Sequence, residues 1–117
     1  MKLTKEQRNT LHQKYNGKCA YCGCDLPKKW HADHIEPIVR NWMDGTCEKP
    51  ENENFENLNP SCPSCNIQKN SYSLEQFREN IKEFVGSLNK YSTQYKFAKK
   101  YGLIEEKEIE VKFYFEK

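Results

Sequence analysis

The sequence predicts a single small domain of the α+β class that spans residues 1–117. The chain has 117 residues, of which 36% are hydrophobic and 13% aromatic, which is enough for one domain with a modest core. A chain of this size benefits from a staple besides its core. Helical periodicity in the middle of the chain and strand-like alternation near residues 109–115 place both element types in it.

The first elements are a helix and a compact cysteine turn. Thr4 and Gln7 form a capping box, and Gly17 suits the end of a helix, so we expect a helix over residues 5–16. The next segment, residues 18–26, places two cysteines two residues apart and a small residue soon after them. This pattern is typical of a zinc knuckle.

An extended segment and a loop follow the knuckle. Residues 29–39 mix Trp, His, Ile and Val, which favours a strand, although Pro37 would interrupt its pairing. Residues 40–56 hold Gly, Pro and many acids without periodicity, which indicates a long loop. A short helix is expected to begin with Pro63 near its first position.

The remaining chain predicts two helices and a strand. Ser73 and Gln76 form a second capping box, and apolar residues then recur at helical spacing to about residue 89. A further helix is expected over residues 92–101. A C-terminal strand is expected where apolar residues alternate with other residues, at Ile109, Val111, Phe113 and Phe115.

The net charge is +2, but positively and negatively charged residues are grouped in separate segments of the chain. Residues 1–31 carry +5, residues 32–66 carry −5, residues 67–102 carry +4 and residues 103–117 carry −2. Local basic patches would therefore hold a polyanion such as DNA. No apolar run is long enough to span a membrane, and the first ten residues are too polar for a secretory signal. We therefore expect an intracellular, cytoplasmic protein that has no membrane partner.

Two cysteine pairs indicate a metal site. Each pair has two intervening residues, which lets two sulfurs bind one tetrahedral metal, and four thiolates make a closed structural zinc site. The expected zinc ligands are Cys19, Cys22, Cys62 and Cys65. Cys24 and Cys47 lie outside this pattern, and we interpret them as free thiols.

The segment enclosed by the cysteine pairs carries further motifs. Asp33, His34 and Ile35 are consecutive, Asn57 precedes Leu58, and Asn66 and Lys69 follow the second cysteine pair. This combination resembles the HNH endonucleases that have a zinc-binding cysteine quartet. The resemblance covers about residues 19–70, and residues 71–117 form a C-terminal extension beyond it.

The resemblance implies a ββα-metal (His-Me finger) core with flanking helices. It implies that Asp33 and Asn66 bind one catalytic divalent ion, that His34 is the general base that activates water, and that Asn57 anchors the loop that orients His34. Asn66 stands where the family name has a histidine. An amide oxygen is a harder ligand than imidazole, so Mg²⁺ or Mn²⁺ is expected as the catalytic ion.

The expected activity is metal-dependent hydrolysis of DNA phosphodiester bonds. Lys69, Lys28 and Lys29 are candidate contacts to nucleic acid, and the wider pool of basic residues comprises Lys14, Lys18, Arg78, Lys82, Lys96, Lys99 and Lys100. His31 either touches metal or phosphate or is an ordinary structural or surface histidine. Small proteins of this family also suggest a homodimer or a larger nuclease or packaging assembly as the working form.

Two other classes of protein compete with this interpretation. A non-catalytic, zinc-stabilised DNA-binding module would keep the cysteines and the basic blocks, but it has no need for Asp33, His34, Asn57 and Asn66 together. A disulfide-stapled secreted protein would require a leader sequence and oxidised thiols.

Overall fold

The computed structural model describes residues 2–38, 43 and 49–117, and it has the mixed helix-and-sheet composition of the α+β class. Its helices are α1 (Lys5–His12), α2 (Pro63–Lys69), α3 (Leu74–Tyr91) and α4 (Thr93–Lys100). Its strands are β1 (His31–His34) and β2 (Leu58–Ser61), and three 3-10 turns are η1 (Pro50–Asn52), η2 (Phe55–Asn57) and η3 (Tyr114–Glu116). Cys47 and the expected strand end at Val39 lie outside the described residues.

Helix α1 begins as predicted but ends early. The Thr4 side chain accepts from the Gln7 backbone N–H at 3.1 Å, and the Gln7 side chain accepts from the Thr4 N–H, so the capping box is present. The helix ends at His12, four residues before the expected end. After His12 the chain forms turns instead of continuing the helix. Asn16 and Gly17 in these turns both have positive φ, 56° and 77°, which a helix does not allow.

The sheet has two antiparallel strands and leads directly into a helix. His31 lies opposite Ser61, and Asp33 lies opposite Asn59. Helix α2 follows directly: Cys62 is its N-cap and accepts from the Cys65 N–H, and Pro63 occupies its first position. The order of strand, strand and helix therefore brings residues 31–34 and residues 62–69 together.

The core consists of two clusters. One joins the cysteine turn to α3 and to the returning chain, and its buried members are Cys19, Ala20, Tyr21, Cys62, Phe77 and Phe113. The other packs α1 on the sheet through Leu11, Trp30 and Leu58. The Arg8 guanidinium lies over the Trp30 ring, 4.2 Å from its centroid, and this tryptophan is buried in the cluster.

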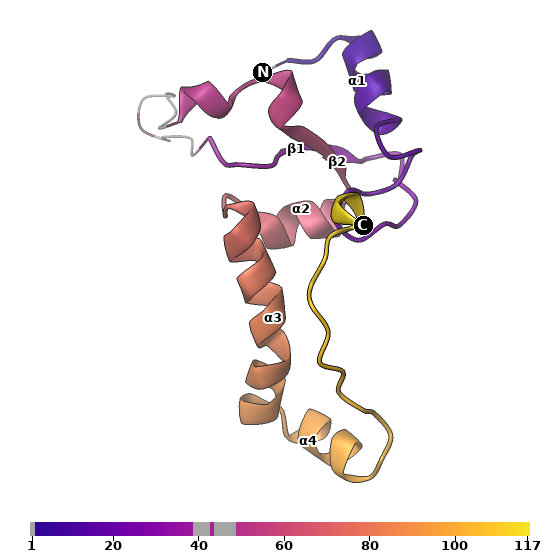
Figure 1. Cartoon of the computed structure of the whole chain (residues 1–117), viewed down its shortest axis with the longest axis vertical. Helices are drawn as coiled ribbons and strands as arrows, with labels where there is room; N and C mark the ends of the chain where they lie inside the picture. The colour runs from indigo at the N-terminus through magenta and orange to yellow at the C-terminus, as the bar shows by residue number, and fades with distance from the viewer. Residues whose placement is uncertain (1, 39–42, 44–48) are drawn as a thin grey trace.

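Helices α3 and α4 and the returning residues 104–113 form an arm that projects from this core (Figure 1). Helices α3 and α4 form where they were expected, but the capping box of α3 is only half formed: the Ser73 side chain accepts from the Gln76 N–H, while the Gln76 side chain bonds Asn80. Helix α4 lies at the end of the molecule away from the sheet (Figure 1). The radius of gyration is 17.2 Å, against about 13 Å for a compact chain of this length. Among the described residues, no helix combines the length and hydrophobicity needed to cross a bilayer.

The predicted C-terminal strand is wrong. In the described part of the chain, residues 104–113 run back extended along the arm without pairing to another strand (Figure 1). Their neighbour is α3, a helix that already satisfies its own backbone groups, so no strand edge is available. The alternation places Phe113 in the core, where its ring stacks on Phe77 at 5.1 Å.

Gly23 and Gly86 provide a matched test of the packing of η3. Gly23 has φ +78°, and an added Cβ would lie 2.6 Å from Tyr114 Cδ1, whereas a Cβ at Gly86 in α3 would meet nothing within 4 Å. Gly23→Ala should therefore lower the free energy of unfolding by about 1–3 kcal/mol. Gly86→Ala should raise it by about 0.5–1 kcal/mol. Urea titrations of both variants measure this, and equal effects would contradict the arrangement.

Candidate active site

His34 lies at the end of β1, and its surroundings hold it on several sides. Its side chain is 22% exposed, and its Nε2 lies 2.8 Å from Oε1 of Glu53. Its backbone carbonyl accepts a 2.6 Å hydrogen bond from Lys69 Nζ. The imidazole is thus positioned from the segment before β2, while its backbone is held from α2.

The contact with Glu53 fixes which imidazole nitrogen is free. Burial acts to raise the pKa of Glu53, but the hydrogen bond with His34 and the imidazole charge outweigh it, so this pKa lies below its usual value. An ionised carboxylate can only accept hydrogen bonds. In the neutral imidazole, Nε2 therefore carries the proton and donates to Glu53, and Nδ1 carries the lone pair.

Asn57 ties together the chain that follows His34. Its side-chain nitrogen donates to the carbonyls of Glu36 and Asn52, each at 2.8 Å, and its side-chain oxygen accepts from the Glu36 N–H at 3.0 Å. Its backbone carbonyl accepts from the Ile35 N–H at 2.8 Å. Three of these hydrogen bonds fasten the two residues after His34 to the segment before β2, and the fourth, to Asn52, holds Asn57 within that segment.

Asp33 is buried beside a lysine and a tyrosine. It is 5% exposed, and its Oδ2 accepts from the Tyr21 hydroxyl at 2.5 Å and lies 3.3 Å from Lys69 Nζ. Burial raises the pKa of Asp33, against the charge of Lys69 and the hydrogen bond from Tyr21. Burial and the neighbouring carboxylate also raise the pKa of Tyr21, so its phenol remains the donor.

Lys69 lies elsewhere than expected. It was expected to reach a phosphate, but its side chain is fully buried. Its ammonium contacts the Asp33 carboxylate and the carbonyls of His34 and Tyr72, the latter at 3.3 Å. Lys69 therefore links the end of α2 to β1 and to the turn at Tyr72.

Asn66 lies one helical turn before Lys69 on α2 and is half-buried. Because Lys69 reaches the end of β1, this face of α2 is directed toward the strand that carries Asp33. A carboxylate oxygen and an amide oxygen are the hard ligands that Mg²⁺ prefers. The donor chemistry of Asp33 and Asn66 therefore fits a divalent ion, although Lys69 shares the same carboxylate.

Cys19, Cys22, Cys62 and Cys65 form a cluster that could hold a metal ion. Their four sulfurs all lie within 4.8 Å of one another, and Sγ of Cys22 and Sγ of Cys62 are 3.8 Å apart. A tetrahedral zinc with about 2.3 Å bonds to sulfur requires about 3.8 Å between its sulfurs, so the geometry fits. Within residues 2–38, 43 and 49–117, no other group of three or more His, Cys, Asp and Glu side chains meets this spacing.

Backbone amides support the sulfurs. Cys19 Sγ accepts from the Cys62 N–H at 3.3 Å, and Cys62 Sγ accepts from the Cys65 N–H at 3.5 Å. A hydrogen bond from the Cys65 thiol and backbone amides, that of Cys62 among them, lower the pKa of Cys19 to about 4, against its burial. The pKa of Cys62 is also lowered, whereas burial raises the pKa of Cys22. The hydrogen bond to Cys19 together with burial raises the pKa of Cys65. Cys19 and Cys62 are therefore the sulfurs that most readily become thiolate, the form that binds metals. Cys24 is exposed and outside the cluster, and the five cysteines that the structure describes form no disulfide.

The basic residues divide into engaged and free groups. Lys14 donates to the Leu58 carbonyl and to Asn59 Oδ1, Lys18 pairs with Asp25, and Arg78 pairs with Glu116. In the described part of the chain, the exposed lysines without an ion pair from the expected pool are Lys28, Lys29, Lys82, Lys96 and Lys100. His31 is exposed on β1.

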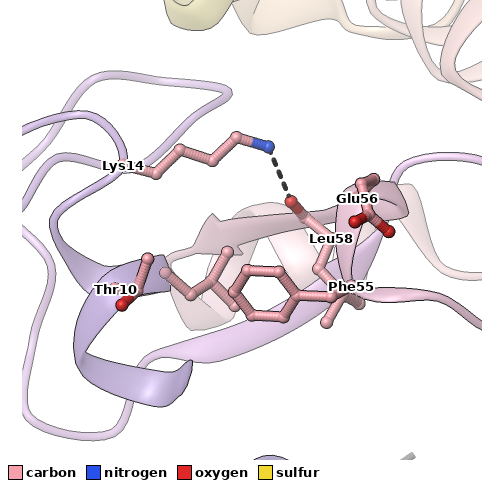
Figure 2. A pocket seen from close by; sticks show the side chains of 6 residues that line it. Thr10, Lys14, Phe55, Glu56 and Leu58 are labelled. Atoms are coloured by element: carbon pink, nitrogen blue, oxygen red, sulfur yellow. Dashed lines mark hydrogen bonds between the residues drawn. The ribbon is translucent and has the colours of Figure 1, made fainter. Parts of the chain in front are cut away.

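A pocket of about 340 Å³ lies between α1 and the start of β2 (Figure 2). Its lining is mostly apolar and comprises Thr10, Leu11, Lys14, Phe55, Glu56 and Leu58. Figure 2 shows Lys14 directed to the Leu58 carbonyl, at 2.9 Å. None of the expected catalytic or metal-binding residues lines this pocket, so the candidate site lies outside it.

Sequence reasoning missed Glu53 and Tyr21. Glu53 lies 19 residues beyond His34 in a stretch without periodicity, and its acidity was the only signal available. Tyr21 lies inside the cysteine turn, where an aromatic residue suggests only a packing role and not a hydrogen bond to Asp33. Both are partners of residues already singled out, and only the folded chain brings them together.

Comparison with known proteins identifies the segment that carries the site. Residues 19–72 match the family model described as HNH endonuclease. The comparison with curated proteins and the comparison with solved structures each gave no match. The matched segment contains the cysteine cluster, β1, β2 and α2, in agreement with the resemblance found in the sequence. Residues 19–72 of this chain, just under half of its length, are therefore similar to the HNH endonuclease family.

Proposed function

We propose that the protein is a metal-dependent endonuclease that hydrolyses DNA phosphodiester bonds, with His34 as the general base. A domain of the HNH family points to a nuclease-type function. The observation that carries the proposal is the His34 imidazole, which is 22% exposed and held through Nε2 by Glu53. With Glu53 as the acceptor, the neutral imidazole would keep its lone pair on Nδ1. This is the state that a proton acceptor for water requires.

In the proposed reaction, Nδ1 of His34 takes a proton from the attacking water. Asn57 keeps the chain after His34 in place, so the imidazole does not have to be ordered when substrate arrives. Glu53 acts as a positioning residue through Nε2, and it stabilises the positive charge that the imidazole gains.

The catalytic metal would be held by Asp33 and Asn66. A divalent ion supplies Lewis-acid stabilisation of charge on the phosphate and on the departing oxygen. Mg²⁺ or Mn²⁺ suits the two oxygen ligands. Tyr21 and Lys69 orient the Asp33 carboxylate from the buried side.

A structural zinc would occupy the four-cysteine cluster. It would join the turn at residues 19–22 to the start of α2, and so fix both ends of the segment that contains His34. Such a closed site has no open position for substrate. Its role would be to hold the fold, separate from the catalytic ion.

Plasmid cleavage tests the proposal. Wild-type protein should nick or linearise supercoiled plasmid when Mg²⁺ or Mn²⁺ is added, and His34→Ala should reduce the rate by about 10²–10⁴-fold because the proton acceptor is lost. Metal dependence is measured by leaving out the divalent ion, since a chelator would also attack the cysteine site. His12→Ala, which removes a histidine on α1, is the matched control and should cleave normally.

Circular dichroism and metal content must show that both variants are folded. If wild-type protein bound DNA but left every plasmid form intact with either ion, the non-catalytic, zinc-stabilised DNA-binding module would replace the nuclease. If His34→Ala cleaved as fast as wild type, another residue would have to be the base.

A further inference from the structure

At the tip of the arm, one side of α4 is occupied by hydrogen bonds to the returning segment. Glu106, on the returning segment, accepts from Asn89 Nδ2 at 2.8 Å, from the Tyr95 hydroxyl at 2.9 Å and from Lys99 Nζ at 3.0 Å. These bonds lower the pKa of Glu106 to about 2. They fasten α3, α4 and the returning segment to one another, and they occupy Lys99.

The opposite side of α4 carries a different set of side chains. Lys96 and Lys100 lie four residues apart, as do Phe97 and Tyr101, so the four form one continuous stripe. We call this stripe the tip face. Phe97 is 52% exposed and Tyr101 is 72% exposed, and their ring centroids are 6.0 Å apart. The rings are therefore packed on each other and open to solvent.

The tip face is positively charged and has no acid of its own. Helix α4 reads TQYKFAKK, which contains no Asp or Glu. In the part of the chain that the structure describes, neither Lys96 nor Lys100 forms an ion pair, and Lys100 Nζ lies 5.5 Å from the Phe97 ring centroid. Two unneutralised ammonium groups thus flank two exposed rings.

We propose that the tip face is a second DNA-contacting surface, on which Lys96 and Lys100 bind backbone phosphates and Phe97 and Tyr101 pack against the sugars or bases beside them. The inference rests on the proposed function in taking DNA as the polyanion. Lysines bind phosphate as mobile point charges, and exposed aromatic rings supply the non-ionic contact to nucleic acid.

A second copy of the chain is the main competing occupant. The centre of a protein–protein interface is depleted of lysine, whereas lysines make up half of the tip face. The arm also carries the tip away from the domain that holds His34 (Figure 1). Contact with DNA at the tip face would extend the bound stretch of DNA beyond the cleavage site. It would involve none of the proposed catalytic residues.

The test measures DNA binding without cleavage. Full-length His34→Ala protein, loaded with zinc, is titrated into a fluorescein-labelled 30-base-pair duplex over a range of NaCl concentrations. Adding Lys96→Gln and Lys100→Gln should reduce the slope of log K against log salt by about 1.8, because two phosphate contacts are lost. The same relation gives a roughly 30-fold weaker affinity at 0.15 M salt. Adding Tyr101→Leu alone should weaken binding with the slope unchanged.

The matched control adds Lys107→Gln and Lys117→Gln, which remove the same charge from exposed positions outside the tip face. Equal slopes and affinities for the two double variants would overturn the proposal, as would a parent protein that does not bind the duplex. Sedimentation analysis that showed a dimer dissociated by the tip variant would assign the face to a second copy instead. Failure of wild type to cut DNA while the tip variant still weakened binding would defeat only the nuclease.

Discussion

Lys69→Met is expected to lower the free energy of unfolding by about 3–5 kcal/mol, a large share of the stability of a small domain. The Lys69 side chain is fully buried, and the Asp33 side chain beside it is only 6% exposed. Methionine fills a similar volume but leaves a buried carboxylate without its cation. Urea unfolding followed by tryptophan fluorescence measures the loss.

Two further variants isolate the cause of this effect. Lys28→Met changes an exposed lysine and should stay within about 0.5 kcal/mol of wild type. Asp33→Leu combined with Lys69→Met removes both charges and should recover much of the stability, because an apolar pair can replace a buried ion pair. If the double variant were as unstable as Lys69→Met alone, the unpaired carboxylate would not be the cause.

Removal of the metal ion that we propose for the four-cysteine cluster is expected to unfold the domain. Zinc bound by four thiolates in small domains contributes about 10–16 kcal/mol, which exceeds the 5–15 kcal/mol that a typical domain has in total. Cys62 also caps α2, so loss of the site would release that helix from β1. Zinc release measured with a colorimetric chelator should coincide with loss of the circular dichroism signal, and added zinc should restore it.

Cysteine variants separate the ligands from their neighbour. Cys65→Ser should abolish stable zinc binding, whereas Cys24→Ser should bind one zinc per chain and fold normally, since Cys24 lies outside the cluster. A metal-free protein that unfolded in the same cooperative transition as the loaded one would show that the cysteines do not hold a stabilising ion.

The sequence was informative wherever the signal was local. Ser73 and Gln76 marked the start of α3, and the hydrogen bond between them is present. The two cysteine pairs were found from spacing alone, because two intervening residues are enough to place two sulfurs on one ion. The roles proposed for Asp33, His34, Asn57 and Asn66 came from the resemblance and remain predictions.

The sequence was uninformative wherever the outcome depended on contacts across the fold. Lysine is rarely buried, so nothing near Lys69 indicated that its ammonium would lie inside the protein. Glu53 became a partner of His34 only through the return of the chain before β2. Alternation at Phe113 and Phe115 indicated an extended backbone, but extension does not require a partner strand.

The packing of Phe113 in the core also means that this part of the core cannot be completed until late in synthesis on the ribosome. Its ring stacks on Phe77 and meets the Tyr21 ring edge-on at 5.5 Å, yet it is made 36 residues after Phe77. At typical translation speeds that interval lasts roughly 2–7 s. During this time the aromatic face beside the cysteine cluster is bare, so we expect the nascent chain to be most exposed to chaperones and to aggregation just before residue 113 emerges.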